Sequence, residues 1–338
     1  MKRAVPLDPA AIAAKILRGD RRLAGRLITQ IDNGDPCAAE VLALLFPHTG
    51  RARVIGITGP PGAGKSTLVA AVVGNYRATG KSVGVVAVDP SSPFTGGALL
   101  GDRIRMNRHA TDPGVFIRSM ASRGCLGGVA LATPGTVRVL DAMGLDVVVV
   151  ETVGAGQSEV GVMDIADCTI LVTMPSGGDA IQMLKAGIME IGDIFVVNKS
   201  DLAGADRAAR EIVAMLHLSD DERAAAPVLL TSAREGIGIA ELVAVIEAHI
   251  AAAEASGALA DARLHHLQRE ALAWAAEHMR QRIRDALETS KMEELIAGLR
   301  ARRIDPTEVG RRMLAASRSA LVLMPASSNK EGACRTSE

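Results

Sequence analysis

This chain has few aromatic side chains and no excess of charge of either sign. Only 2% of its 338 residues are aromatic, and Lys plus Arg equal Asp plus Glu at 38 each, so the formal net charge is zero. Proteins that bind nucleic acids use basic surfaces and aromatic stacking platforms. We therefore expect no nucleic acid partner.

Cysteine is sparse, and no hydrophobic run is long. The four cysteines form no Cys-x-x-Cys pair, which argues against a zinc ribbon or a redox pair and suits a reducing compartment. The apolar runs reach only the length of strands, so we expect no membrane-spanning helix. Asp8 and Lys15 interrupt the N-terminal segment, which argues against a signal peptide. These absences predict a cytoplasmic protein without membrane contact.

A phosphate-binding loop is the most informative feature that is present. Residues 59–67 fit the pattern G-x-x-x-x-G-K-[S/T] between an apolar, strand-like run and a helix-like segment. Such a turn lets backbone N–H groups face phosphate oxygens at a helix N-terminus. Lys65 would reach the β- and γ-phosphates, and the Ser66 hydroxyl would ligate Mg²⁺. The predicted GTP ligands here are Gly59, Pro60, Pro61, Gly62, Ala63, Gly64, Lys65, Ser66 and Thr67.

A second motif identifies the base as guanine. Asn198, Lys199 and Asp201 fit the pattern N-K-x-D at the end of a strand-like run. The Asp201 carboxylate can accept hydrogen bonds from guanine N1–H and from its exocyclic amine, whereas adenine would leave that carboxylate unpaired. A later strand-like run ends in the Ser-Ala turn that contacts guanine in GTPases. These predicted ligands are Ser232, Ala233 and Arg234.

Strand-like and helix-like segments alternate between about residues 53 and 250. Most of the strand-like runs are short, β-branched and apolar on both faces, which predicts an α/β fold with a doubly wound, mainly parallel sheet. We expect an N-terminal helical region (1–50), a P-loop GTPase domain (51–255), a C-terminal helical dimerisation region (256–322) and a flexible tail (323–338). The expected strands are Val54–Thr58, Val83–Val88, Val115–Arg118, Val147–Glu151, Thr169–Met174, Ile194–Asn198 and Val228–Ser232.

Two acidic residues at strand ends are candidate metal and switch residues. Asp89 ends the second predicted strand, and Glu151 ends the fourth, where it stands in the place of the Asp of a D-x-x-G motif. We expect both to flank the phosphate loop and to serve the Mg²⁺ sphere. The Gly154 N–H could sense the γ-phosphate and move when that group leaves.

Taken together, these motifs resemble the MeaB/ArgK proteins and the human methylmalonic aciduria type A protein, a branch of the P-loop GTPases. The resemblance spans essentially the whole chain, helical ends included. It rests on residues 59–67, 88–92, 101–106, 123–128, 151–159 and 198–201.

The resemblance implies a GTPase that assists an adenosylcobalamin-dependent acyl-CoA mutase, such as methylmalonyl-CoA mutase, by gating cofactor loading and supporting reactivation. Adenosylcobalamin would then enter only through the partner mutase. The family also implies a homodimer held by terminal helices and a cobalamin adenosyltransferase as a further partner. The implied metal ligands are Ser66, Asp89, Asp102 and Glu151. The implied catalytic residues are Lys65, Asp89, Asp102, Glu151, Gln157 and Lys185.

One departure bears on the hydrolysis step. Ras-like proteins place a Gln directly after the D-x-x-G glycine to orient the attacking water. Here Ala155 takes that position, and Gln157 follows two residues later. We therefore expect slow basal hydrolysis that the partner accelerates, with Gln157, Asp179 or Lys185 completing the site.

Other functions remain open from the sequence. The first alternative is a metal-delivery GTPase of the same branch, although Cys125 and the adjacent His265 and His266 show no clear ligand cluster. A second is an amino-acid transport ATPase or kinase, against which the guanine motif counts. A third is a signal-recognition-type GTPase, whose Met-rich groove the dispersed methionines do not supply.

Overall fold

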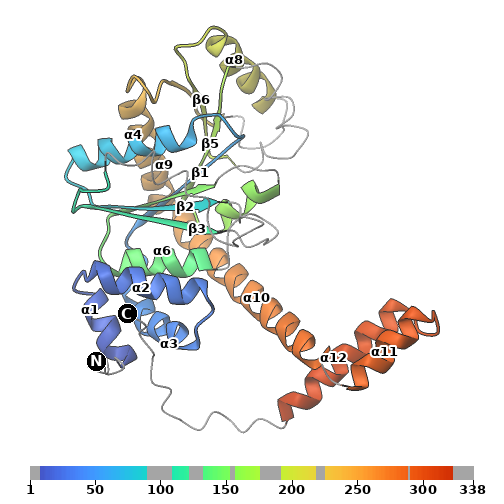
Figure 1. Ribbon diagram of the computed structural model, residues 1–338. Helices are drawn as coiled ribbons and strands as arrows, with labels where there is room; N and C mark the ends of the chain where they lie inside the picture. The colour runs from blue at the N-terminus through green and yellow to red at the C-terminus, as the bar shows by residue number, and fades with distance from the viewer. Residues whose placement is uncertain are drawn as a thin grey trace. The chain divides into compact units, whose positions relative to one another are not determined.

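The computed structural model describes residues 8–89, 109–121, 132–152, 157–175, 192–217, 225–287 and 290–322. It divides into two compact units (Figure 1). The first ends along the chain at His266, and the second begins at Leu267. The nucleotide-binding site described below lies in the first unit.

A seven-stranded sheet forms the centre of the first unit, in the order β3-β2-β4-β1-β5-β6-β7. Each neighbouring pair is parallel. The predicted fold class is confirmed, and each expected strand is present to within a few residues at its ends. The strands are β1 Arg53–Thr58, β2 Val83–Asp89, β3 Val115–Ala121, β4 Val147–Thr152, β5 Cys168–Thr173, β6 Ile194–Asn198 and β7 Val228–Thr231.

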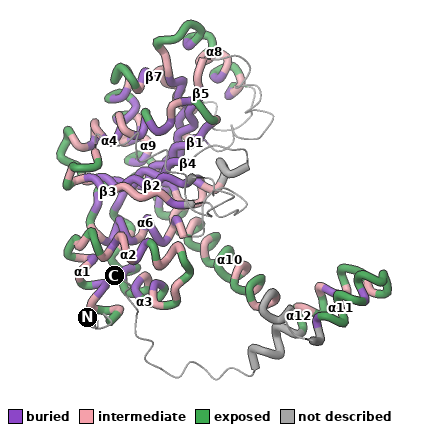
Figure 2. Tube along the Cα trace, viewed as in Figure 1, coloured by how far each residue is buried: buried purple, intermediate pink, exposed green. Residues whose placement is uncertain are grey.

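Valine-rich strands of this kind need cover on both faces of the sheet. Every residue of β4, β5 and β6 is buried (Figure 2). One face packs against α4 (Lys65–Ala78) and α9 (Ile239–Ser256), whose buried residues join one core cluster. A second cluster joins α6 (Ala132–Ala142) to the N-terminal helices. A third hydrophobic cluster contains buried residues of β6 and of the helix α8 (Ala205–Leu216).

The N-terminal helices are α1 (Pro9–Ile16), α2 (Arg21–Asp32) and α3 (Pro36–Leu45), followed by the short helix η1 (Phe46–His48). Asp35 caps α3, because its carboxylate accepts a hydrogen bond from the Cys37 N–H at 2.9 Å. Asp8 precedes Pro9 in the same way but makes no side-chain cap.

The C-terminal helices are α10 (Ala258–Leu287), α11 (Ser290–Arg300) and α12 (Pro306–Val322). Asp305 caps α12 by accepting hydrogen bonds from the N–H groups of Thr307 and Glu308 at 2.8 and 3.1 Å. These backbone donors hold the pKa of Asp305 below its ordinary value. The predicted tail, 323–338, lies outside the described residues.

Within the described ranges, no single helix is long and apolar enough to cross a membrane; α9 and α10 pass such a test only as a pair, across a 90° bend.

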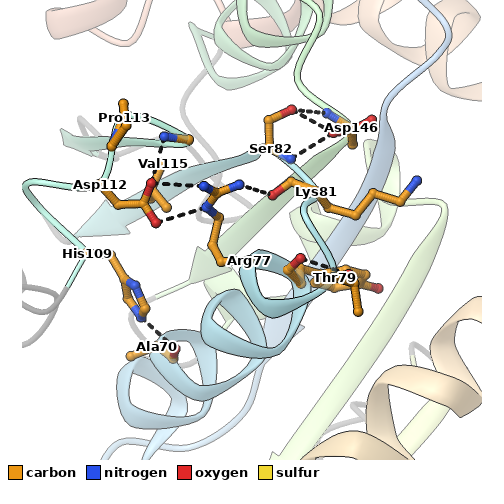
Figure 3. A network of polar contacts seen from close by, with 12 residues as sticks. Ala70, Arg77, Thr79, Lys81, Ser82, His109, Asp112, Pro113, Val115 and Asp146 are labelled. Atoms are coloured by element: carbon orange, nitrogen blue, oxygen red, sulfur yellow. Dashed lines mark hydrogen bonds and ion pairs between the residues drawn. The ribbon is translucent and has the colours of Figure 1, made fainter.

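The C-terminal end of α4 is tied to the amino edge of the sheet (Figure 3). The Arg77 guanidinium donates to Asp112 through Nε at 2.9 Å and Nη2 at 3.0 Å, and its Nη1 donates to the Lys81 carbonyl. Asp112 also accepts from the Gly114 N–H at 2.7 Å, just before β3. This two-pronged ion pair fixes α4 at the end remote from the phosphate loop.

A second clamp ties the start of α10 to the approach to β1. The Arg263 guanidinium donates to both Asp167 oxygens at 2.7 Å and to the carbonyls of Gly50 and Ala52. The Asp167 side chain is 2% exposed, and it also accepts from the Val54 N–H. Removing the guanidinium would leave a buried carboxylate without its counter-charge.

Arg263→Ala should therefore lower the free energy of unfolding by about 3 kcal/mol, as expected for breaking one side of a buried ion pair. Urea titration followed by circular dichroism measures the change. Arg207→Ala is the matched control, because Arg207 pairs with Glu211 along α8 while its side chain stays 80% exposed. That control should change the free energy by less than about 0.5 kcal/mol. Equal losses in both variants would contradict the clamp.

Candidate nucleotide-binding site

The phosphate-loop motif forms the turn between β1 and α4, at the carboxyl end of the parallel sheet. Two of its three glycines leave no room for a side chain. A Cβ on Gly59 would lie 2.0 Å from the Val172 carbonyl oxygen, and one on Gly64 would lie 2.5 Å from Asn198 Nδ2. Both glycines also have a positive φ, of 138° and 88°. Only glycine fits this close approach.

The chemistry-bearing residues of the loop begin the helix. Because α4 starts at Lys65, the free N–H groups of its first turn lie beside the loop. Lys65 is buried, and its ammonium donates to the carbonyls of Gly59 and Pro60. Pro61, Gly62 and Thr67 are exposed, and Ala63 is buried. The loop therefore combines an accessible surface with a cation and a helix N-terminus, which suits an anion.

A buried hydroxyl–carboxylate pair lies next to this turn. The Ser66 hydroxyl donates to Glu151 Oε1 at 2.6 Å, and both residues are at most 5% exposed. Glu151 reaches this position because β4 pairs with β1, with Glu151 opposite Ile57. A neighbouring bond, from the Thr152 hydroxyl to the Thr58 hydroxyl at 2.9 Å, joins the same two strand ends. Hard oxygen donors of this kind fit Mg²⁺.

Of the two acidic residues expected to flank the phosphate loop, Glu151 stands on the strand that pairs directly with β1. In the sheet, β4 lies between β1 and β2, so Asp89 at the end of β2 is one strand farther from the loop. In the sequence β4 comes after both β1 and β2, yet in the sheet it lies between them. The order of the strands along the chain does not reveal this arrangement. The Asp89 side chain lies outside the described part of the structure.

Asn198 connects the phosphate loop to the guanine motif. Its Nδ2 donates to the Ala63 carbonyl at 2.9 Å. Its Oδ1 accepts from the Thr231 hydroxyl at 3.2 Å and from the Ala233 N–H at 3.1 Å. Asn198 is 2% exposed. One carboxamide thus fixes the ends of β1, β6 and β7 in register with one another.

The other residues of the guanine motif lie around Asn198. The Ser232 hydroxyl donates to Asp201 Oδ1 at 2.8 Å, so the carboxylate is oriented while the residue remains exposed. Lys199 adopts a left-handed backbone with φ of 59°, and its ammonium reaches Met174 Sδ at 3.6 Å. Arg234 lies exposed in the turn after Ala233. The two predicted base-contacting segments are therefore adjacent in space.

Several predicted residues fall outside what the structure describes. Gln157 begins the short helix η2 (Gln157–Asp164), but its side chain is not described. The remaining ones lie wholly outside the described ranges, and they are Asp102, Gly154, Asp179 and Lys185.

Sequence reasoning missed three polar or polarisable residues that support the site. Thr231 bonds Asn198, Thr152 bonds Thr58, and Met174 contacts Lys199. Thr152 lies inside the 151–159 stretch without an assigned role, whereas Thr231 ends β7 and Met174 directly follows β5. Only the sheet order, which places β4 and β5 on either side of β1, would have indicated Thr152 and Met174.

The sequence of this chain is similar to those of several known proteins. A protein of Pyrococcus abyssi is 47% identical over 296 residues, which cover 86% of this chain and 91% of that protein. The GTPase ArgK of Escherichia coli is 40% identical over 202 residues, covering 58% of this chain and 61% of its own. The mouse mitochondrial methylmalonic aciduria type A homolog is 40% identical over 193 residues, covering 56% of this chain and 46% of its own.

A solved structure and a family profile complete the comparison. The crystal structure of a LAO/AO transport system kinase is similar with a TM-score of 0.66 and 25% identity, covering 94% of this chain and 98% of that one. The profile of the family described as methylmalonyl Co-A mutase-associated GTPase MeaB matches residues 24–289. With the P-loop fold and the guanine motif in place, this match shows that the chain belongs to the MeaB family of GTP-hydrolysing P-loop enzymes.

Proposed function

We propose that this GTPase acts as a switch and chaperone for an adenosylcobalamin-dependent acyl-CoA mutase. The single observation that carries this proposal is the family match over residues 24–289, a family described by its association with methylmalonyl-CoA mutase. The name of the mouse relative points to the same metabolism. Adenosylcobalamin would belong to the mutase, and this chain would gate its loading and support reactivation.

GTP would bind along the carboxyl edge of the sheet. The phosphates would meet the Gly59–Thr67 turn, where Lys65 is the cation and α4 supplies its N-terminus. Nucleotide phosphates would compete with the Gly59 and Pro60 carbonyls for the Lys65 ammonium. The base would lie against Asp201, which Ser232 orients. A carboxylate so placed can pair with both donors on guanine, which favours GTP over ATP.

Ser66 and Glu151 would hold Mg²⁺, because their buried oxygens converge beside the first turn of α4. When bound, the ion neutralises charge on the transferred phosphoryl group. Asp89 and Asp102 are further proposed metal ligands. Gly154, Gln157, Asp179 and Lys185 are the proposed switch and partner-responsive residues.

A homodimer held by the C-terminal helices is part of the same proposal. The helix α10 exposes large apolar side chains, including Leu272 at 71% and Trp274 at 58%. Exposed apolar groups on one helix suit a partner surface.

Asp201→Asn should weaken GTP binding by about 10- to 100-fold, because the amide cannot accept from both guanine donors. Xanthine carries a carbonyl where guanine carries its exocyclic amine, so the new amide should bind XTP more tightly than the parent does. Equilibrium titration with fluorescent GTP and XTP measures both. Asp206→Asn, an exposed aspartate in the first turn of α8, is the control and should change neither affinity. Unchanged GTP affinity in Asp201→Asn would remove Asp201 from the base site.

GTP hydrolysis should be slow for the protein alone and should rise when an adenosylcobalamin-dependent acyl-CoA mutase is added. Phosphate release measured with and without methylmalonyl-CoA mutase tests this directly. Lys65→Ala should reduce both rates at least about 100-fold, because it removes the positive charge that stabilises negative charge developing on the phosphates in the transition state. Lys185→Ala should reduce the rate stimulated by the mutase.

Lys81→Ala is the matched control for both lysine variants, because Lys81 is exposed at the opposite edge of the sheet. A rate that no such mutase changes would retain the GTPase and exclude the chaperone role. It would then favour the metal-delivery alternative.

A further inference from the structure

Three metal-ligating side chains meet at the amino edge of the sheet, away from the nucleotide site. Cys168 is the first residue of β5, Asp193 directly precedes β6, and His249 lies on α9. Their ligand atoms, one sulfur, one carboxylate oxygen and one imidazole nitrogen, all lie within 4.8 Å of one another. The phosphate loop and the guanine motif lie at the carboxyl ends of β1 and β6, so the cluster belongs to neither.

Asp193 is held in place by the backbone of β5. Its Oδ2 accepts from the Thr169 N–H at 2.8 Å, and its own N–H donates to the Thr169 carbonyl at 2.9 Å. These two bonds fix the carboxylate beside Cys168, the residue before Thr169. Hydrogen bonds of this kind orient the ligands of metal sites.

His249 comes from a different layer. It lies next to Ile250 and one turn after Ile246, both fully buried against the sheet. This placement brings the imidazole to the margin of the α9 core face. Among the described residues, nothing hydrogen-bonds that imidazole. His249 is only partly buried, so an ion could reach the cluster from solvent.

Cys168 is a free and fully buried thiol. Burial raises the pKa of that thiol well above its ordinary value, and the nearby Asp193 and Asp167 carboxylates raise it further. Asp167 has its own counter-charge in Arg263 at 2.7 Å. Asp193 has no ion-pair partner among the described residues. The Asp193 carboxylate therefore adds an uncompensated negative charge beside the Cys168 sulfur and the His249 imidazole, which suits a cation.

We propose that Cys168, Asp193 and His249 bind one Zn²⁺ ion, with the fourth position open to water. Zinc accepts thiolate, imidazole and carboxylate together in tetrahedral geometry, whereas Mg²⁺ and Ca²⁺ take oxygen ligands. Ligand distances of about 2.0–2.3 Å would place the donor atoms about 3.3–3.8 Å apart, which small side-chain rotations can reach. Binding forms a Zn–S bond, breaks the S–H bond and releases that proton to solvent.

The test is zinc binding to the full chain after chelator treatment, in excess Mg²⁺ and GDP so that the nucleotide site is saturated. Competition with a chromophoric chelator should show one tight equivalent of Zn²⁺. Co²⁺ in its place should give a thiolate-to-cobalt charge-transfer band. Cys168→Ser and His249→Ala should each weaken Zn²⁺ binding at least about 10-fold, and Cys168→Ser should abolish the band.

His217→Ala is the matched control, because His217 is an exposed histidine at the end of α8. It should bind Zn²⁺ as the parent does. His249→Ala keeps the test decisive if Cys168→Ser fails to fold, since His249 is not fully buried. No tight equivalent in the parent would overturn the proposal, as would binding that survives His249→Ala or that His217→Ala weakens equally. The result is independent of the mutase assay, because the proposal does not use the mutase.

Discussion

The nucleotide site depends on one buried carboxamide. Asn198 donates to the loop that follows β1 and accepts from groups at the end of β7 and just after it. Its hydrogen bonds replace contacts that water would otherwise make, and in a site this buried each lost partner is costly. Because the same side chain approaches Gly64 too closely for any Cβ there, the residue types at both positions are determined together.

Local features of this fold were predictable, because they depend on neighbouring residues. The strands of branched apolar residues, the proline-started helices α3 and α12 and the glycine-rich turn all follow from short-range steric and hydrogen-bonding rules. The adjacency of Ser66 and Glu151 required one further step, a parallel sheet whose strand ends converge. That step succeeded for Glu151 because β4 does pair with β1.

Long-range relations were not predictable. The insertion of β4 between β1 and β2 separates Asp89 from the phosphate loop by one strand. The ion pair of Arg263 with Asp167 joins segments far apart in the chain. Cys168, Asp193 and His249 come together from two strands and a helix, with no motif spacing. A single sequence holds no record of such contacts, because they follow from how whole elements pack.

The anchoring of α4 has a mechanical consequence. One end of the helix continues directly from the loop that Asn198 holds, and the other is fixed by the two-pronged pair of Arg77 with Asp112. With both ends anchored, α4 should keep its position during nucleotide turnover. A conformational change that follows GTP hydrolysis would then have to move other segments relative to α4.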